Sequence, residues 1–61
     1  MTAHDFEELL DEALGEYAED GVQDIKSIRS FEDAGVLTKN AGIVIKFKDG
    51  NEFQITIVKS A

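Results

Sequence analysis

Residues 43–59 read IVIKFKDGNEFQITIVK, and this stretch decides the fold. Apolar side chains occupy every second position in residues 43–48 and again in residues 52–59. A period of two places alternate side chains on opposite faces of a β-strand. Asp49-Gly50-Asn51 between the two segments is a tight-turn signal, so the segments are predicted to form a β-hairpin. The face expected to line the core carries Ile43, Ile45, Phe47, Phe53, Ile55 and Ile57.

The N-terminal part of the chain has the period of an amphipathic helix. Its apolar residues recur at intervals of three and four, at Phe6, Leu9, Leu10, Ala13, Leu14 and Tyr17. This spacing forms one stripe along a helix of 3.6 residues per turn. Thr2 is placed to cap the helix, with Asp5 where a capping box has Glu or Gln, and Gly21 suits a left-handed C-cap. A helix from Ala3 to Asp20 is therefore predicted.

Residues 22–31 are compatible with two structures. In a strand, their apolar side chains would fall on both faces unless a β-bulge lay near Ser27-Ile28. A short second helix is the alternative, because Ile25 and Ile28 are three residues apart. The β-branched content and the loop that follows favour a bulged strand. Over residues 33–42 the connection carries two glycines.

These elements predict an α+β fold class. One N-terminal amphipathic helix packs on a three-stranded antiparallel β-meander in the order αβββ, which buries both apolar stripes in a single domain over residues 1–61. Val36 and Leu37 are expected to fold back as a cap on one edge of the core. The second face of the sheet, which carries Val44, is expected to have no cover from the chain itself.

The composition limits the protein to one small domain. A chain of 61 residues is near the lower end of what folds unaided, so almost every large apolar residue is needed in the core. The absence of cysteine excludes disulfides and thiolate metal sites. The longest apolar run, Ile43-Val44-Ile45, is far short of the roughly 20 residues of a membrane span. Residues 1–5 lack the features of a signal peptide, so a cytoplasmic protein without membrane contacts is expected.

The net charge of −7 is unevenly distributed. Residues 1–24 hold nine acids and no Lys or Arg, which gives −9, whereas residues 25–61 hold six bases and four acids, which gives +2. Direct binding of nucleic acid is not expected, because neutralisation of phosphates by Lys and Arg supplies most of that affinity. One explanation of the excess charge is that it only keeps a small domain in solution.

No pattern in the sequence indicates catalysis. His4 is the only histidine and is expected to be a surface residue beside the N-terminus. The sequence has no cysteine nucleophile and no glycine-rich phosphate-binding motif. Carboxylates one helical turn apart, such as Glu8 and Glu12, hold a hard cation only weakly, and EF-hand spacing is absent. We therefore expect no enzyme, no cofactor and no metal site.

The acidic side of the predicted helix points to a binding function. Like-charge pairs four residues apart cost a helix a few tenths of a kcal/mol each, and no lysine relieves them here. We expect this side to dock on a partner protein with a basic surface, one that normally grips nucleic acid. This requires that Lys26, Arg29 and the sheet lysines do not lie against it. The expected contact residues are Glu8, Asp11, Glu12, Glu16 and Glu19.

The second hypothesis is a structural module that self-associates. A homo-oligomer, for example a homodimer, would use the open sheet face or the strand edge near Ile57 and Val58. In size, acidity and predicted αβββ plan the chain resembles small accessory proteins that phages encode, including inhibitors of host nucleases. This general resemblance implies an inhibitor or adaptor that mimics nucleic acid.

Overall fold

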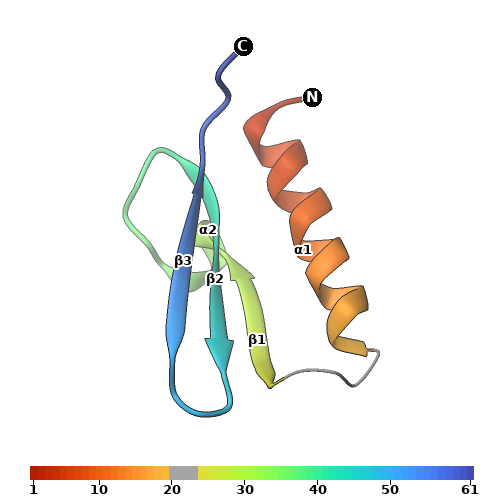
Figure 1. Cartoon of the computed structure of the whole chain (residues 1–61). Coiled ribbons are helices and arrows are strands. Elements are labelled where there is room, and N and C mark those ends of the chain that lie inside the picture. Colours follow the sequence, from red (N-terminus) through yellow and green to blue (C-terminus); the bar gives the residue numbers. More distant parts are fainter. Residues whose placement is uncertain (20–23) are drawn as a thin grey trace.

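The computed structural model describes residues 1–19 and 24–61, apart from the side chain of Glu19. Its three strands form an antiparallel sheet in the order β1-β2-β3, and α1 lies along one face (Figure 1). This confirms the α+β fold in the order αβββ, with α2 as an addition after the first strand. The elements are α1 (Ala3–Glu19), β1 (Ile25–Ser30), α2 (Phe31–Ala34), β2 (Ala41–Phe47) and β3 (Glu52–Ile57).

The N-terminus of α1 is closed by the predicted capping box. Thr2 Oγ1 accepts a hydrogen bond from the Asp5 N–H at 3.0 Å, and Asp5 Oδ2 accepts one from the Thr2 N–H at 2.9 Å. The Thr2 N–H, and after it the Thr2 hydroxyl, holds the pKa of the Asp5 carboxyl below its ordinary value. Asp5 is thus engaged at the helix end. The predicted helix end at Asp20 and the predicted C-cap at Gly21 lie outside the described residues.

Strands β2 and β3 form the predicted hairpin. Ile43 stands opposite Ile55, as the alternation of apolar residues requires. At the loop, the Phe47 N–H donates to the Asn51 carbonyl at 2.8 Å, and the Gly50 N–H donates to the Phe47 carbonyl at 3.1 Å. Gly50 has a φ of 96°, the left-handed conformation that a three-residue loop ending in a G1 bulge needs.

Strand β1 carries a β-bulge. This confirms the bulged strand, which the sequence analysis favoured over a second helix. Ile25 stands opposite Phe47, whereas Ser27 stands opposite Lys46, so Lys26 is the additional residue. The bulge therefore lies immediately before its predicted position at Ser27-Ile28.

The strand ends at Ser30 rather than at Phe31 because Ser30 caps α2. Ser30 Oγ accepts a hydrogen bond from the Asp33 N–H at 3.1 Å, and Gly35 ends this short helix. The predicted start of the strand at Val22 lies outside the part of the chain that the structure describes.

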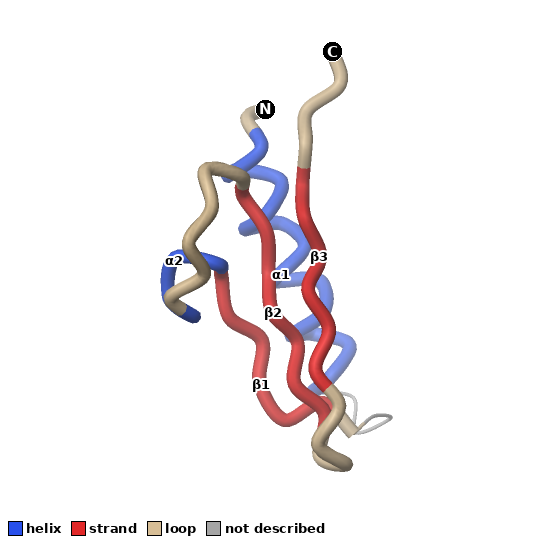
Figure 2. Tube along the Cα trace, turned by 90° about the vertical axis from the view of Figure 1, so that its left-hand side faces the viewer, coloured by secondary structure: helices blue, strands red, loops and turns tan. Residues whose placement is uncertain are grey.

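The core extends to both faces of the sheet. The expectation that the face of Val44 lacks cover is wrong, because Ala34 of α2 and Val36 line a hollow with Val44 there. Figure 2 shows the strands in front of α1, with α2 beside β1. Val36 is half-buried, but Leu37 is fully exposed, so the predicted capping by Leu37 is also wrong. The buried hydrophobic residues are Phe31, Ala41, Ile43, Val44 and Ile45.

Gly42 makes room for Phe31 on the α2 face. A β-carbon at position 42 would overlap with the Phe31 ring and with the backbone carbonyl of Ile55. Phe31 is buried, so its ring packs on the sheet at the position where a side chain is missing.

Replacing Gly42 with alanine tests this packing. The added methyl group meets a buried ring and a backbone carbonyl, so we expect Gly42→Ala to lower the free energy of unfolding by about 1–3 kcal/mol. Gly15→Ala is the control, since nothing lies within 4 Å of a β-carbon there. Alanine should stabilise that helix position by up to about 1 kcal/mol. Urea unfolding followed by circular dichroism should shift in opposite directions for the two variants; a Gly42→Ala protein as stable as the wild type would contradict the packing.

Candidate functional site

Helix α1 turns only part of its apolar stripe toward the sheet. Leu10 and Leu14 are half-buried, whereas Phe6 and Leu9 keep 43% and 48% of their surface exposed. Ala13 is exposed as well. The prediction that the whole stripe is buried is therefore wrong. The helix is rotated so that Glu7 takes part of the space next to the sheet, and Asp11 is half-buried as well.

Glu7 differs from the other acids of α1 because it supports the sheet. Its side chain is 15% exposed, and Oε1 accepts a hydrogen bond from the Gly42 N–H at 2.8 Å. Continued by one residue, the β1–β2 register would place Phe31 opposite Gly42. Phe31 instead begins α2, so Glu7 supplies the acceptor for the Gly42 N–H. The one sequence signal for this role is that Glu7 precedes Leu10 and Leu14 by three and seven residues, on the same side of the helix.

The acidic flank consists of Glu8, Asp11, Glu12 and Glu16. Glu8, Glu12 and Glu16 are exposed and follow at intervals of four residues, so they form a line with one carboxylate per about 6 Å of helix axis. Asp11 is half-buried beside this line. Glu19, the fifth predicted contact residue, belongs to α1, but its side chain lies outside the described residues.

Two basic side chains of the sheet point away from α1. Arg29 stands opposite Val44, and Ser27 stands opposite Lys46, so Arg29 and Lys46 share a face with Val44. All four residues line the hollow beside α2. The sheet therefore separates Arg29 and Lys46 from the acidic flank.

Within the described chain, the negative charges of the acidic flank are not neutralised by ion pairs. Within residues 1–19 and 24–61 the structure contains two ion pairs, Lys46 with Glu52 at 3.6 Å and His4 with Glu7 at 3.8 Å. Neither pair includes an acid of the flank. Within these residues Lys26, Arg29 and the sheet lysines therefore form no ion pair with a flank carboxylate, and Arg29 and Lys46 lie on the other face of the sheet.

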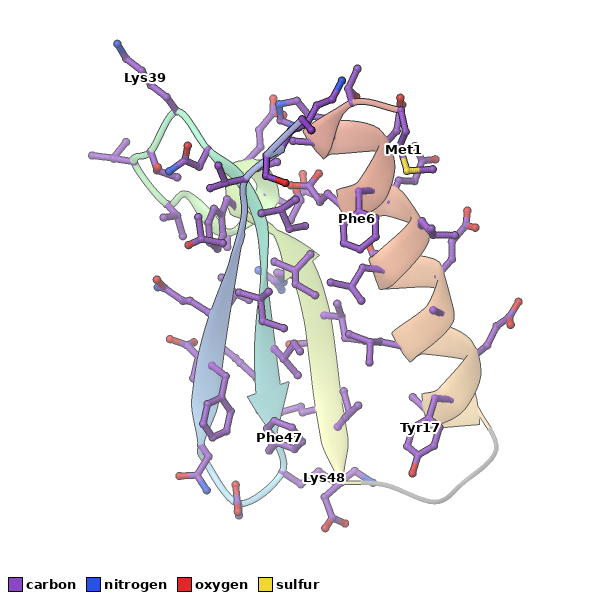
Figure 3. All side chains as sticks on the ribbon, turned by 45° about the horizontal axis from the view of Figure 1, so that its top comes forward. Met1, Phe6, Tyr17, Lys39, Phe47 and Lys48 are labelled. Atoms are coloured by element: carbon purple, nitrogen blue, oxygen red, sulfur yellow. The ribbon has the colours of Figure 1, made fainter. Side chains whose placement is uncertain are left out.

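An apolar cleft separates the N-terminal half of α1 from β3. The cleft has a volume of about 530 Å³ and is lined by Phe6, Ile55, Ile57 and residues from both ends of the chain. Because α1 packs chiefly over β1 and β2, Phe53 and Ile55 remain 57% and 37% exposed. The predicted burial of these two residues is wrong. Figure 3 shows Phe6 on the side of α1 that faces the strands.

The described His, Asp and Glu side chains were compared with the arrangement that a metal ion requires. Within the part of the chain that the structure describes, no group of three or more His, Asp and Glu side chains is arranged to hold a metal ion. His4 is largely exposed, and the carboxylate near it is already engaged by Gly42. The absence of catalysis stays a prediction. Neither helix, over its described residues, combines the length and apolarity that crossing a membrane requires.

No protein-family model matches the sequence, and searches of curated proteins and of solved structures returned no match. The surface features of the described residues that could support binding are the acidic flank, the apolar cleft and the edges of the sheet.

Glu7 and Glu8 are adjacent acids with different expected roles in folding. Glu7→Ala leaves the Gly42 N–H without its acceptor, so we expect the free energy of unfolding to fall by about 1–3 kcal/mol. Glu8→Ala makes the same charge change at an exposed position and should stay within about 0.5 kcal/mol of the wild type. Denaturant unfolding of both variants gives the comparison, and equal losses would refute the structural role of Glu7.

Proposed function

We propose that this chain is a non-enzymatic binding protein, an inhibitor or adaptor, whose acidic flank docks on a basic surface of a partner protein. The observation that carries the proposal is the exposed line of Glu8, Glu12 and Glu16, whose carboxylates take part in neither ion pair among the described residues. An exposed row of one sign of charge attracts and orients a surface of the opposite sign before contact.

The arrangement of the charges favours binding over simple solubility. Glu8 with Glu12, and Glu12 with Glu16, are like-charge pairs that each cost α1 a few tenths of a kcal/mol. A surface on which acids and bases are mixed would keep the protein in solution equally well. Here Arg29 and Lys46 lie across the sheet, so the two signs are kept apart.

The kind of partner follows from the spacing of the carboxylates. Four acids from Glu8 to Glu16 span about 12 Å of helix axis, about one per 4 Å, close to the roughly 3.4 Å of DNA helix axis per phosphate of one strand. A protein surface that normally grips a nucleic-acid backbone is therefore the favoured partner. We place this activity in the cytoplasm and compare it with the small accessory inhibitors that phages encode, from the size, acidity and fold of the chain.

Neutralising the flank tests the proposal directly. The triple variant Glu8→Gln, Glu12→Gln, Glu16→Gln should bind the partner about 3- to 150-fold more weakly, since exposed ion pairs contribute about 0.2–1 kcal/mol each. The control triple, Asp24→Asn, Glu32→Gln, Asp33→Asn, changes net charge equally at exposed positions outside α1 and should bind as the wild type does.

The partner is first captured from a lysate on the immobilised wild-type chain and eluted with increasing salt. Its affinity is then measured for the three proteins by isothermal titration calorimetry. Exposed charges are screened over about 8–10 Å near physiological ionic strength, so wild-type affinity should fall steeply with salt. A partner that binds all three proteins equally, or whose affinity does not respond to salt, would rule the proposal out.

A further inference from the structure

Strand β3 forms one edge of the sheet, and its backbone groups alternate in direction. The Phe47 N–H donates to the Asn51 carbonyl, so the odd-numbered residues of the β2–β3 ladder bond to each other. The even-numbered residues Gln54 and Thr56 therefore point their N–H and C=O groups away from β2. Such a row of outward backbone groups is a template for another strand.

The two edges of the sheet differ in their protection. Strand β1 has the bulge at Lys26, the charged side chain of Arg29, and α2 directly after its end, all of which hinder pairing. Strand β3 is a six-residue strand, EFQITI, with one charged residue at its first position. Its side chains Phe53 and Ile55 are exposed, and Ile55 lines the cleft. Strand β3 is thus the edge that is open to pairing.

We propose that β3 pairs antiparallel with β3 of a second copy of this chain. With a two-fold axis through Ile55, that residue stands opposite its own copy, Phe53 stands opposite Ile57 of the second copy, and Gln54 stands opposite Thr56. Apolar residues then meet on the α1 face and polar residues on the other face. The outward groups of Gln54 and Thr56 form the hydrogen-bonded pairs, so this surface is self-complementary.

The charge distribution directs a second copy to this edge. Residues 43–61 hold three lysines and two acids, a net charge of +1, whereas residues 1–24 carry −9 and repel another copy. In the proposed register Lys59 of one chain stands opposite Asn51 of the other, next to Asp49 of the same loop, whereas Glu52 lies on the other face with Lys46. Opposite charges therefore meet at both ends of the paired strands.

The resulting sheet has six strands, with both copies of α1 on one face because the axis is perpendicular to the sheet. Phe53 and Ile55 gain cross-strand neighbours and lose part of their exposure. Six residues of edge pairing bury less than the total of about 1,600 Å² in a standard interface. A dissociation constant on the order of 10–100 µM is therefore expected.

Sedimentation equilibrium of the full chain from about 5 µM to about 1 mM brackets this range. The wild type should pass from monomer to dimer. Ile55→Lys puts like charges opposite each other on the axis and should weaken the dimer at least about tenfold. Leu37→Lys is the matched control, because it adds the same charge to a fully exposed loop residue and should dimerise as the wild type does.

Thr56→Pro is a second variant that preserves the hairpin. The Thr56 N–H points away from β2, so proline removes a donor from the outer edge without breaking the β2–β3 ladder. Circular dichroism checks that it folds, and we expect it to remain monomeric over the whole range.

Amide hydrogen exchange locates the contact. In the wild type, exchange at Gln54 and Thr56 should slow as concentration rises, whereas Phe53 and Ile55, already bonded to β2, should not change. A wild type that is monomeric at about 1 mM would overturn the proposal. A Thr56→Pro protein that still dimerises would also overturn it. The same holds if amide protection increases with concentration at residues other than Gln54 and Thr56.

Discussion

The hydrogen bond from the Gly42 N–H to Glu7 Oε1 joins α1 to the sheet at the point where β1 ends. On the α2 face, the same glycine leaves space for Phe31. Leaving this N–H unpaired in a partly buried place would cost about 1–3 kcal/mol, comparable with fully burying one large apolar side chain. Because Glu7 lies about 100° around the helix from Phe6, Phe6 lines the cleft beside β3 instead of packing on the centre of the sheet, and it stays 43% exposed.

Strand β3 is left uncovered because Glu7 fixes the position of α1 and because one helix is narrower than three strands. A helix is about 10 Å across, whereas three strands spaced by about 4.8 Å form a sheet about 14 Å wide. One helix leaves part of such a sheet open, and the Glu7 contact lies at the end of β1, so the open part is β3. The exposure of Phe53 and Ile55 is thus a property of the architecture.

The elements set by local pattern could be predicted from the sequence, whereas the features set by packing could not. The alternation around Asp49-Gly50-Asn51 specifies the hairpin, and Thr2 with Asp5 specifies the start of α1, because neighbours in the chain make these contacts. Glu7 looks like its neighbour Glu8 in the sequence, and only the distant Gly42 distinguishes the two acids. Glu8, Glu12 and Glu16, by contrast, could be predicted to lie in one exposed line, because a four-residue spacing aligns side chains on a helix without any tertiary contact.

The uneven charge distribution gives the two proposed contacts separate surfaces. Glu8, Glu12 and Glu16 of the acidic flank face solvent on α1, and the edge of β3 lies beyond the cleft, so a partner at one leaves the other free. Paired hairpins would place two flanks on one face of a single sheet. A basic partner that spans both would bind the second flank at a raised effective concentration, because linked sites turn the second contact into an intramolecular one. Repulsion between the N-terminal segments favours contact through the near-neutral hairpins, and the same acids attract a partner of opposite charge.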